Sequence, residues 1–134
     1  MTTTIIALEK DLFFAVKIRD TLRHYDMDTT ITRTLNSFEQ ELGSHDNSLP
    51  ALAIVNIATK GVDWEAAIQA ARAQHLPVLA FGSHMDLDAR AKALQAGAQK
   101  VVANSKFARD MPGLVQRTLD TPDNDISDSD DDEE

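Results

Sequence analysis

The sequence of 134 residues contains no cysteine, which excludes disulfide bridges, thiolate metal sites and cysteine nucleophiles. It also lacks any apolar run close to the ~20 residues that a membrane-spanning helix needs. The first residues, Met1 to Thr4, carry no basic patch followed by an apolar stretch, so we expect no signal peptide. These absences predict a cytoplasmic protein that does not enter a membrane.

Basic runs are missing as well, and almost all of the net charge of −9 lies at one end. Residues 121–134 hold eight of the 22 acidic residues and no basic one, so residues 1–120 are nearly neutral. Without a basic footprint, no nucleic-acid partner is expected. We interpret residues 1–120 as one domain and residues 121–134 as a disordered acidic tail. The tail is either an arm for a basic partner or a solubilising extension.

Short apolar and β-branched runs predict five strands. Most of them show no polar alternation, which is typical of strands buried on both faces of a parallel sheet. The second run does alternate and is expected at an edge of the sheet. The predicted strands are Ile5–Leu8, Thr29–Leu35, Ala51–Val55, Pro77–Phe81 and Lys100–Val102.

Helical segments follow each strand, and most begin after an aspartate that can cap the first turn. Gly97 is expected to end the fourth helix with a positive φ. Residues 43–50 form a turn-rich connection. The predicted helices are residues 12–24 after Asp11, a short helix capped by Asn36 or Ser37, residues 64–74 after Asp63, residues 87–96 after Asp86, and residues 111–119 after Asp110.

This alternation of strands and helices predicts a flavodoxin-like α/β fold, a three-layer sandwich with a five-stranded parallel sheet in the order 2-1-3-4-5. In such sheets, binding sites form beyond the carboxyl ends of the strands, beside strand 1. The segments that reach this edge are residues 9–11, 56–60, 82–84 and 103–106.

Across residues 4–120 the chain resembles the receiver domain of bacterial response regulators. The run Ala51–Asn56 is similar to the third receiver strand, which ends at the phosphoacceptor, and Pro77–Phe81 is similar to the fourth strand. Gly97-Ala98, Val101-Val102 and Ser105–Phe107 resemble the fifth strand and its exit loop.

The same resemblance implies that the phosphorylation pocket is degenerate. Asn56 stands where the family has its acceptor aspartate, and an amide is not a phosphoryl acceptor. Glu9 and Lys10 stand where two acids help to hold Mg²⁺, so one ligand has become a cation.

Three further positions of the family pattern are changed. Gly82 replaces the switch hydroxyl, although Ser83 follows it. Val101 replaces the switch aromatic residue, and Asn104 replaces the phosphate-pairing lysine. With every part of the pocket altered, no metal, cofactor or catalytic residue is expected.

The resulting hypothesis is a stand-alone pseudo-receiver that acts as a phosphorylation-independent signalling and protein-interaction module. The alternative is a small-molecule sensor that uses the vacated pocket near Asn56, Ser83, His84 and Asn104. An enzyme ranks last, because neither a nucleophile–base pair nor a phosphate-binding glycine motif is present.

Lys10 has two interpretations. Its ammonium group could pair with Glu9 or Asp11, neutralise the pocket and lock it in one state. Alternatively, Lys10 points to solvent, where an ion pair contributes only ~0–1 kcal/mol.

A mixed-charge face on the fourth helix, fifth strand and last helix is the candidate interface for a protein partner or a second copy of the chain. The resemblance suggests this face, because receivers commonly dock there; the alternative is an ordinary solvated surface. Its candidate residues are Asp86, Arg90, Lys92, Lys100 and Arg109.

Overall fold

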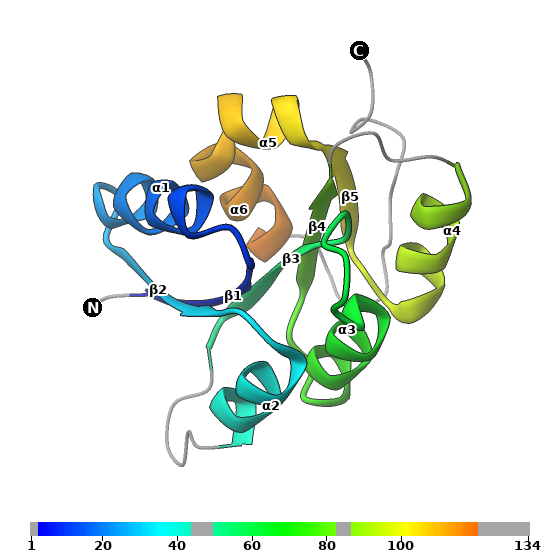
Figure 1. Ribbon diagram of the computed structural model, residues 1–134. Coiled ribbons are helices and arrows are strands. Elements are labelled where there is room, and N and C mark those ends of the chain that lie inside the picture. The colour runs from blue at the N-terminus through cyan, green and yellow to red at the C-terminus, as the bar shows by residue number, and fades with distance from the viewer. Residues whose placement is uncertain (1–2, 44–49, 83–86, 121–134) are drawn as a thin grey trace.

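Five parallel strands form the central layer of the computed structural model, which describes residues 3–43, 50–82 and 87–120 (Figure 1). Their order in the sheet is β2-β1-β3-β4-β5, with β2 and β5 at the edges. The strands are β1 (Thr3–Leu8), β2 (Met27–Thr32), β3 (Leu52–Asn56), β4 (Val78–Gly82) and β5 (Lys100–Ala103). The predicted flavodoxin-like fold and strand order are confirmed.

Helices cover both faces of the sheet. The first, fifth and sixth helices share one apolar core with the sheet, and the second, third and fourth share the other (Figure 1). In chain order they are α1 (Leu12–Arg23), α2 (Leu35–Gly43), α3 (Trp64–Ala73), α4 (Leu87–Ala96), α5 (Asn104–Arg109) and α6 (Met111–Asp120). None of the helices in these described residues is long and apolar enough to cross a membrane.

The apolar runs of β1, β3, β4 and β5 lack alternation because these four strands contribute to both cores. Successive side chains of a strand point to opposite faces. In β4, Leu79 and Phe81 join the core beneath α1 and α6, whereas Val78 and Ala80 join the core beneath α3. All four side chains are fully buried, as the uninterrupted run predicts.

Two of the predicted helix caps are confirmed. Asp11 accepts hydrogen bonds from the backbone N–H groups of Phe13 (2.9 Å) and Phe14 (3.4 Å). Asp63 accepts one from the N–H group of Ala66 at 3.1 Å. The cap predicted at Asp86 lies outside the described residues.

The cap predicted for α2 is wrong. The helix begins at Leu35, and the hydroxyl of Thr34 accepts a hydrogen bond from the N–H group of Ser37 at 3.1 Å. Correspondingly, β2 runs from Met27 to Thr32, so the strand begins and ends earlier than its β-branched residues indicated. It is an edge strand, as predicted.

The short helix α5 was not predicted, because its residues were assigned to the exit loop of the fifth strand. It is anchored by Phe107, which is fully buried, and it leads directly into α6. Asp110 joins the two helices, and its carboxylate accepts a hydrogen bond from Arg117 at 2.9 Å. Gly97 ends α4 with a φ of +121°, as expected.

Candidate functional site

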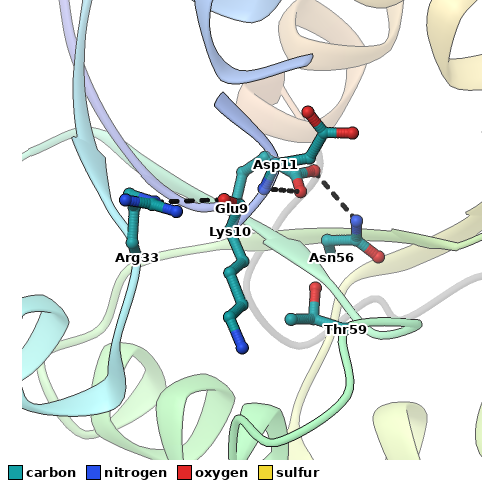
Figure 2. A pocket seen from close by; sticks show the side chains of 6 residues that line it. All are labelled: Glu9, Lys10, Asp11, Arg33, Asn56 and Thr59. Atoms are coloured by element: carbon teal, nitrogen blue, oxygen red, sulfur yellow. Dashed lines mark hydrogen bonds between the residues drawn. The ribbon is translucent and has the colours of Figure 1, made fainter. Parts of the chain in front are cut away.

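Glu9 and Asn56 meet at the carboxyl edge of the sheet. Glu9 follows β1 directly and Asn56 is the last residue of β3, the strand that pairs with β1. The side-chain nitrogen of Asn56 donates a hydrogen bond to Oε1 of Glu9 at 2.9 Å (Figure 2). The sheet thus joins two groups that are 47 residues apart in the sequence.

The other end of the Asn56 amide is also engaged. Its Oδ1 accepts a hydrogen bond from the backbone N–H group of Ala58 at 2.9 Å. Both polar groups of the side chain therefore have intramolecular partners, which determines the orientation of the amide. Asn56 links the end of β3, the loop that follows it and the buried carboxylate of Glu9.

The Glu9 carboxylate is unusually well buried, with 2% of the residue exposed. Burial raises its pKa above the ordinary value, and the nearby Asp11 carboxylate also raises it. Hydrogen bonds from the backbone N–H group of Asp11 (3.1 Å) and from the Asn56 amide oppose the rise in pKa without cancelling it. Among the described residues, the charged form of Glu9 is stabilised by neutral hydrogen-bond donors and not by a cation.

Lys10 does not form the predicted ion pair with Glu9 or Asp11. Among the described residues it makes no ion pair at all, and its side chain extends away from both carboxylates (Figure 2). Its Nζ lies instead near the backbone of Gly61, 3.8 Å from where a Cβ would stand. The lock hypothesis is therefore wrong, and Lys10 is exposed as the alternative expected.

Two cavities open on this edge and share Glu9, Asp11 and Asn56. The larger has a volume of ≈ 410 Å³ and is also lined by Lys10, Arg33 and Thr59 (Figure 2). The smaller has a volume of ≈ 180 Å³, and its other lining residues are Phe14 and Asn104. Of the predicted pocket residues, Glu9 and Asn56 line both cavities, Lys10 lines the larger one and Asn104 lines the smaller one.

Two residues of the predicted pocket lie elsewhere. Val101 is fully buried in the core beneath α4 and lines neither cavity. Gly82 is the last residue of β4 and is closely packed, since a Cβ there would lie 3.2 Å from Cγ1 of Ile57. Ser83 and His84 lie outside the described residues.

Four lining residues were not among the predicted site residues, namely Asp11, Phe14, Arg33 and Thr59. Asp11 and Thr59 do lie in segments that were predicted to reach this edge of the sheet. Asp11 was predicted as a helix cap, and Phe14 lies within the helix that was predicted to follow it. The position of Asp11 within the Glu9–Asp11 segment was the available signal. Nothing in the sequence singled out Arg33, whose Nε donates to the backbone carbonyl of Lys10 at 3.0 Å.

The candidate interface is smaller than predicted. Lys100 is buried, with 5% exposed, so its inclusion in a docking surface is wrong. Arg90 is half-buried and donates to the backbone carbonyl of Val101 at 2.9 Å. Lys92 and Arg109 are exposed, and Lys92 pairs with Asp88 at 3.3 Å. Asp86 lies outside the described residues.

Within residues 3–43, 50–82 and 87–120, no group of three or more histidine or acidic side chains is arranged to hold a metal ion. In the smaller cavity, the other described lining residues beside the carboxylates of Glu9 and Asp11 supply two amides and a phenyl ring. The described polar groups of this cavity are therefore two carboxylates and two amides, which can all form hydrogen bonds.

Comparison with solved structures identifies the fold, whereas comparison of sequences finds no match. No protein-family model matches the sequence, and no curated protein matches it. Solved structures do match. A CheY-like receiver domain protein from Methanospirillum hungatei has a TM-score of 0.78 at 16% identity, over 90% of this chain and 95% of that chain.

Two further structures agree. A protein from Chloroflexus aurantiacus assigned as a response regulator has a TM-score of 0.78 at 18% identity, over 90% of this chain and all of that chain. The receiver domain of response regulator 1452 from Francisella has a TM-score of 0.74 at 12% identity, over 89% and 98% of the two chains. The chain therefore has the fold of a response regulator receiver domain.

Proposed function

We propose that this chain is a receiver-fold signalling module that acts by binding a protein partner, without phosphorylation and without catalysis. The receiver fold supports a role in signalling, since its matches are response regulators. The side chains at the carboxyl edge of the sheet support the absence of phosphorylation. The proposal joins these two observations.

One observation carries the proposal, namely the bonding of Asn56. This residue occupies the end of β3, where the resemblance places the phosphoacceptor. An amide nitrogen has no free lone pair for attack on phosphorus, and here it donates to Glu9 while the amide oxygen accepts from Ala58. The side chain thus acts as a structural bridge.

The surroundings of Asn56 support the same conclusion. Lys10 stands at a position where the resemblance implies a metal-ligating acid, and its side chain extends away from the site (Figure 2). Gly82, which replaces the switch hydroxyl, lies so close to Ile57 and Ala58 that a side chain there would need those neighbours to shift. A phosphoryl group would find neither an acceptor nor the usual groups to hold it.

The direct test is exposure of the full chain to acetyl phosphate with MgCl₂, and separately to beryllofluoride with MgCl₂. We expect no phosphoryl adduct by intact-mass spectrometry and no shift in thermal unfolding, because Asn56 cannot accept the group. An active receiver domain treated in parallel is the positive control. An acyl-phosphate adduct on the wild-type chain would overturn the proposal.

For the binding surface, we propose the exposed part of α4, β5 and the segment α5–α6, with self-association as one form of docking. Arg109 at the end of α5 is an exposed cation on this surface. We expect sedimentation velocity to show concentration-dependent dimers that Arg109→Glu weakens several-fold. Lys60→Glu, an exposed charge reversal in the loop before α3, is the matched control and should leave the dimers intact. A wild-type chain that stays monomeric at every concentration would remove self-association from the proposal.

A small-molecule sensor is the second candidate, and the two cavities beside Asn56 favour it. Asn56 and Asn104 line the smaller cavity, as that hypothesis requires. However, both polar ends of Asn56 are already engaged, which leaves fewer polar groups for a ligand than the sequence suggested. A titration with a free small cation, set out below, separates this candidate from a protein-binding module.

A further inference from the structure

The smaller cavity has an unusual lining. Its lining residues within the described part of the chain are Glu9, Asp11, Phe14, Asn56 and Asn104, which supply two carboxylates, two amides and one phenyl ring. No basic side chain is among them. A volume of ≈ 180 Å³ accommodates a small charged group rather than a large cofactor.

The charge of Glu9 is not compensated within the described part of the protein. The residue is 2% exposed, and its hydrogen bonds come from the Asn56 amide and the Asp11 backbone, which are neutral groups. Among the described residues, neither Glu9 nor Asp11 forms an ion pair. A buried charge without an ionic partner is costly, and carboxylate oxygens can accept further hydrogen bonds. A cation with several N–H donors would meet both needs.

Phe14 adds an aromatic surface to the acidic cavity. Its ring is held by two buried rings, with centroid distances of 5.5 Å to Phe81 and 6.0 Å to Phe107. A cation against a phenyl ring is attracted by the electron density of the ring face. A planar guanidinium stacks on such a ring and is more weakly hydrated than an ammonium, so it is the better fit.

Exposed apolar side chains lie on the first turns of α1, the helix whose start lines this cavity. Leu12 is 56% exposed, Phe13 is 90% exposed and Val16 is 41% exposed. Leu12 and Phe13 lie in the sequence between Asp11 and Phe14, the two residues at the start of this helix that line the cavity. A free small cation would leave these apolar groups in water, whereas a protein segment could cover them.

We propose that the smaller cavity binds the guanidinium group of an arginine side chain, presented by a protein partner whose neighbouring apolar residues cover Leu12, Phe13 and Val16. The inference rests on the proposed function, and it adds a docking site at the cavity and α1 that is separate from the surface proposed on α4, β5 and α5–α6. Glu9 and Asp11 supply the negative charge, and Phe14 supplies the stacking surface. The burial that raises the pKa of Glu9 is consistent with a carboxylate that lacks its cation.

The test uses the ¹⁵N-labelled full chain and three probes. They are the peptide N-acetyl-Leu-Arg-Leu-amide, the same peptide with neutral citrulline in place of arginine, and methylguanidinium chloride. The side-chain amide resonances of Asn56 report on the cavity, because this group donates to Glu9. We expect the arginine peptide to shift them saturably, methylguanidinium to do so more weakly, and the citrulline peptide to leave them unchanged.

Matched variants separate the charge from the apolar contact. Asp11→Asn keeps a residue that caps helices well but removes the charge, and it should weaken peptide binding about tenfold. Asp20→Asn, an exposed change on the same helix, is the control and should bind like the wild type. Phe13→Ala should weaken the peptide and leave methylguanidinium unaffected.

Three results would overturn the inference: equal binding of the citrulline peptide, equal loss in Asp11→Asn and Asp20→Asn, or no saturable shift with the arginine peptide. Methylguanidinium that binds as tightly as the peptide would overturn the protein-partner form, and it would favour the sensor. These failures are distinct from failure of the proposed function, which would show itself as a phosphoryl adduct whatever the peptide does.

Discussion

Replacing Asn56 with aspartate is expected to destabilise the folded protein at neutral pH. The variant removes the donor that Glu9 uses at 2.9 Å and places a second carboxylate oxygen against it. Glu9 is 2% exposed, so solvent screens the repulsion poorly. We expect a loss of about 2–4 kcal/mol in the free energy of unfolding, as when a buried charged group loses its partner.

The loss of stability in Asn56→Asp should become larger as the pH rises. The folded-state pKa of Glu9 is raised above its ordinary value of 4.5, so the folded protein holds this proton more tightly than the unfolded chain does. Stability from this group is therefore present below pH 4.5 and falls as the pH rises through the raised pKa. In Asn56→Asp, two carboxylates compete for one proton, and the fall with pH should be steeper than in the wild type.

Urea unfolding at a series of pH values from about 4.5 to neutrality measures this difference. The matched control is Asn36→Asp, the same chemical change at an exposed position near the start of α2, where an acid is favourable. Its stability should match or slightly exceed that of the wild type. An Asn56→Asp variant as stable as the wild type at neutral pH, with the same pH dependence, would contradict the bridge between Asn56 and Glu9.

Replacing Phe107 with alanine is expected to have the largest effect on stability. The ring is fully buried and stacks on Phe81, with the centroids 4.1 Å apart and the planes 7° from parallel. Truncation leaves a cavity where α5 joins the sheet, and such changes cost about 3–5 kcal/mol. Phe14 would also lose one of the two rings that hold it at the cavity.

Thermal and urea unfolding of Phe107→Ala and Phe13→Ala would be compared. Phe13 is 90% exposed, so the same truncation there should change stability by no more than about 0.5 kcal/mol. Similar losses in the two variants would show that Phe107 does not anchor α5 to the sheet. A large loss confined to Phe107→Ala is the expected result.

The layers of the fold and the starts of several helices can be predicted from local patterns in the sequence. Uninterrupted apolar runs such as the one ending at Val55 are typical of strands buried on both faces, and alternate residues of β1, β3, β4 and β5 do fall in the two cores. Asp11 and Asp63 marked helix starts, because a carboxylate satisfies free backbone N–H groups there. These signals involve residues that are close together in the chain, so they can be recognised from the sequence alone.

Helix α5 could not be predicted from such local signals. It has six residues, too few to show an apolar period, and no side chain caps its start after Ala103. Its formation depends on Phe107 reaching the stacked rings of the core. Similarly, the charge of Lys100 predicted exposure, but its place on β5 left the side chain buried.

The candidate site, in contrast, is created by tertiary packing. Adjacent residues at a strand end point in different directions, and this separates Glu9, which is buried, from Lys10, which is exposed. The pairing of β1 with β3 then brings Glu9 to Asn56 across 47 residues. The sequence supplied the residue types that argue against phosphoryl transfer, but packing determined which of them touch, because burial and hydrogen bonding depend on neighbours that are distant in the chain.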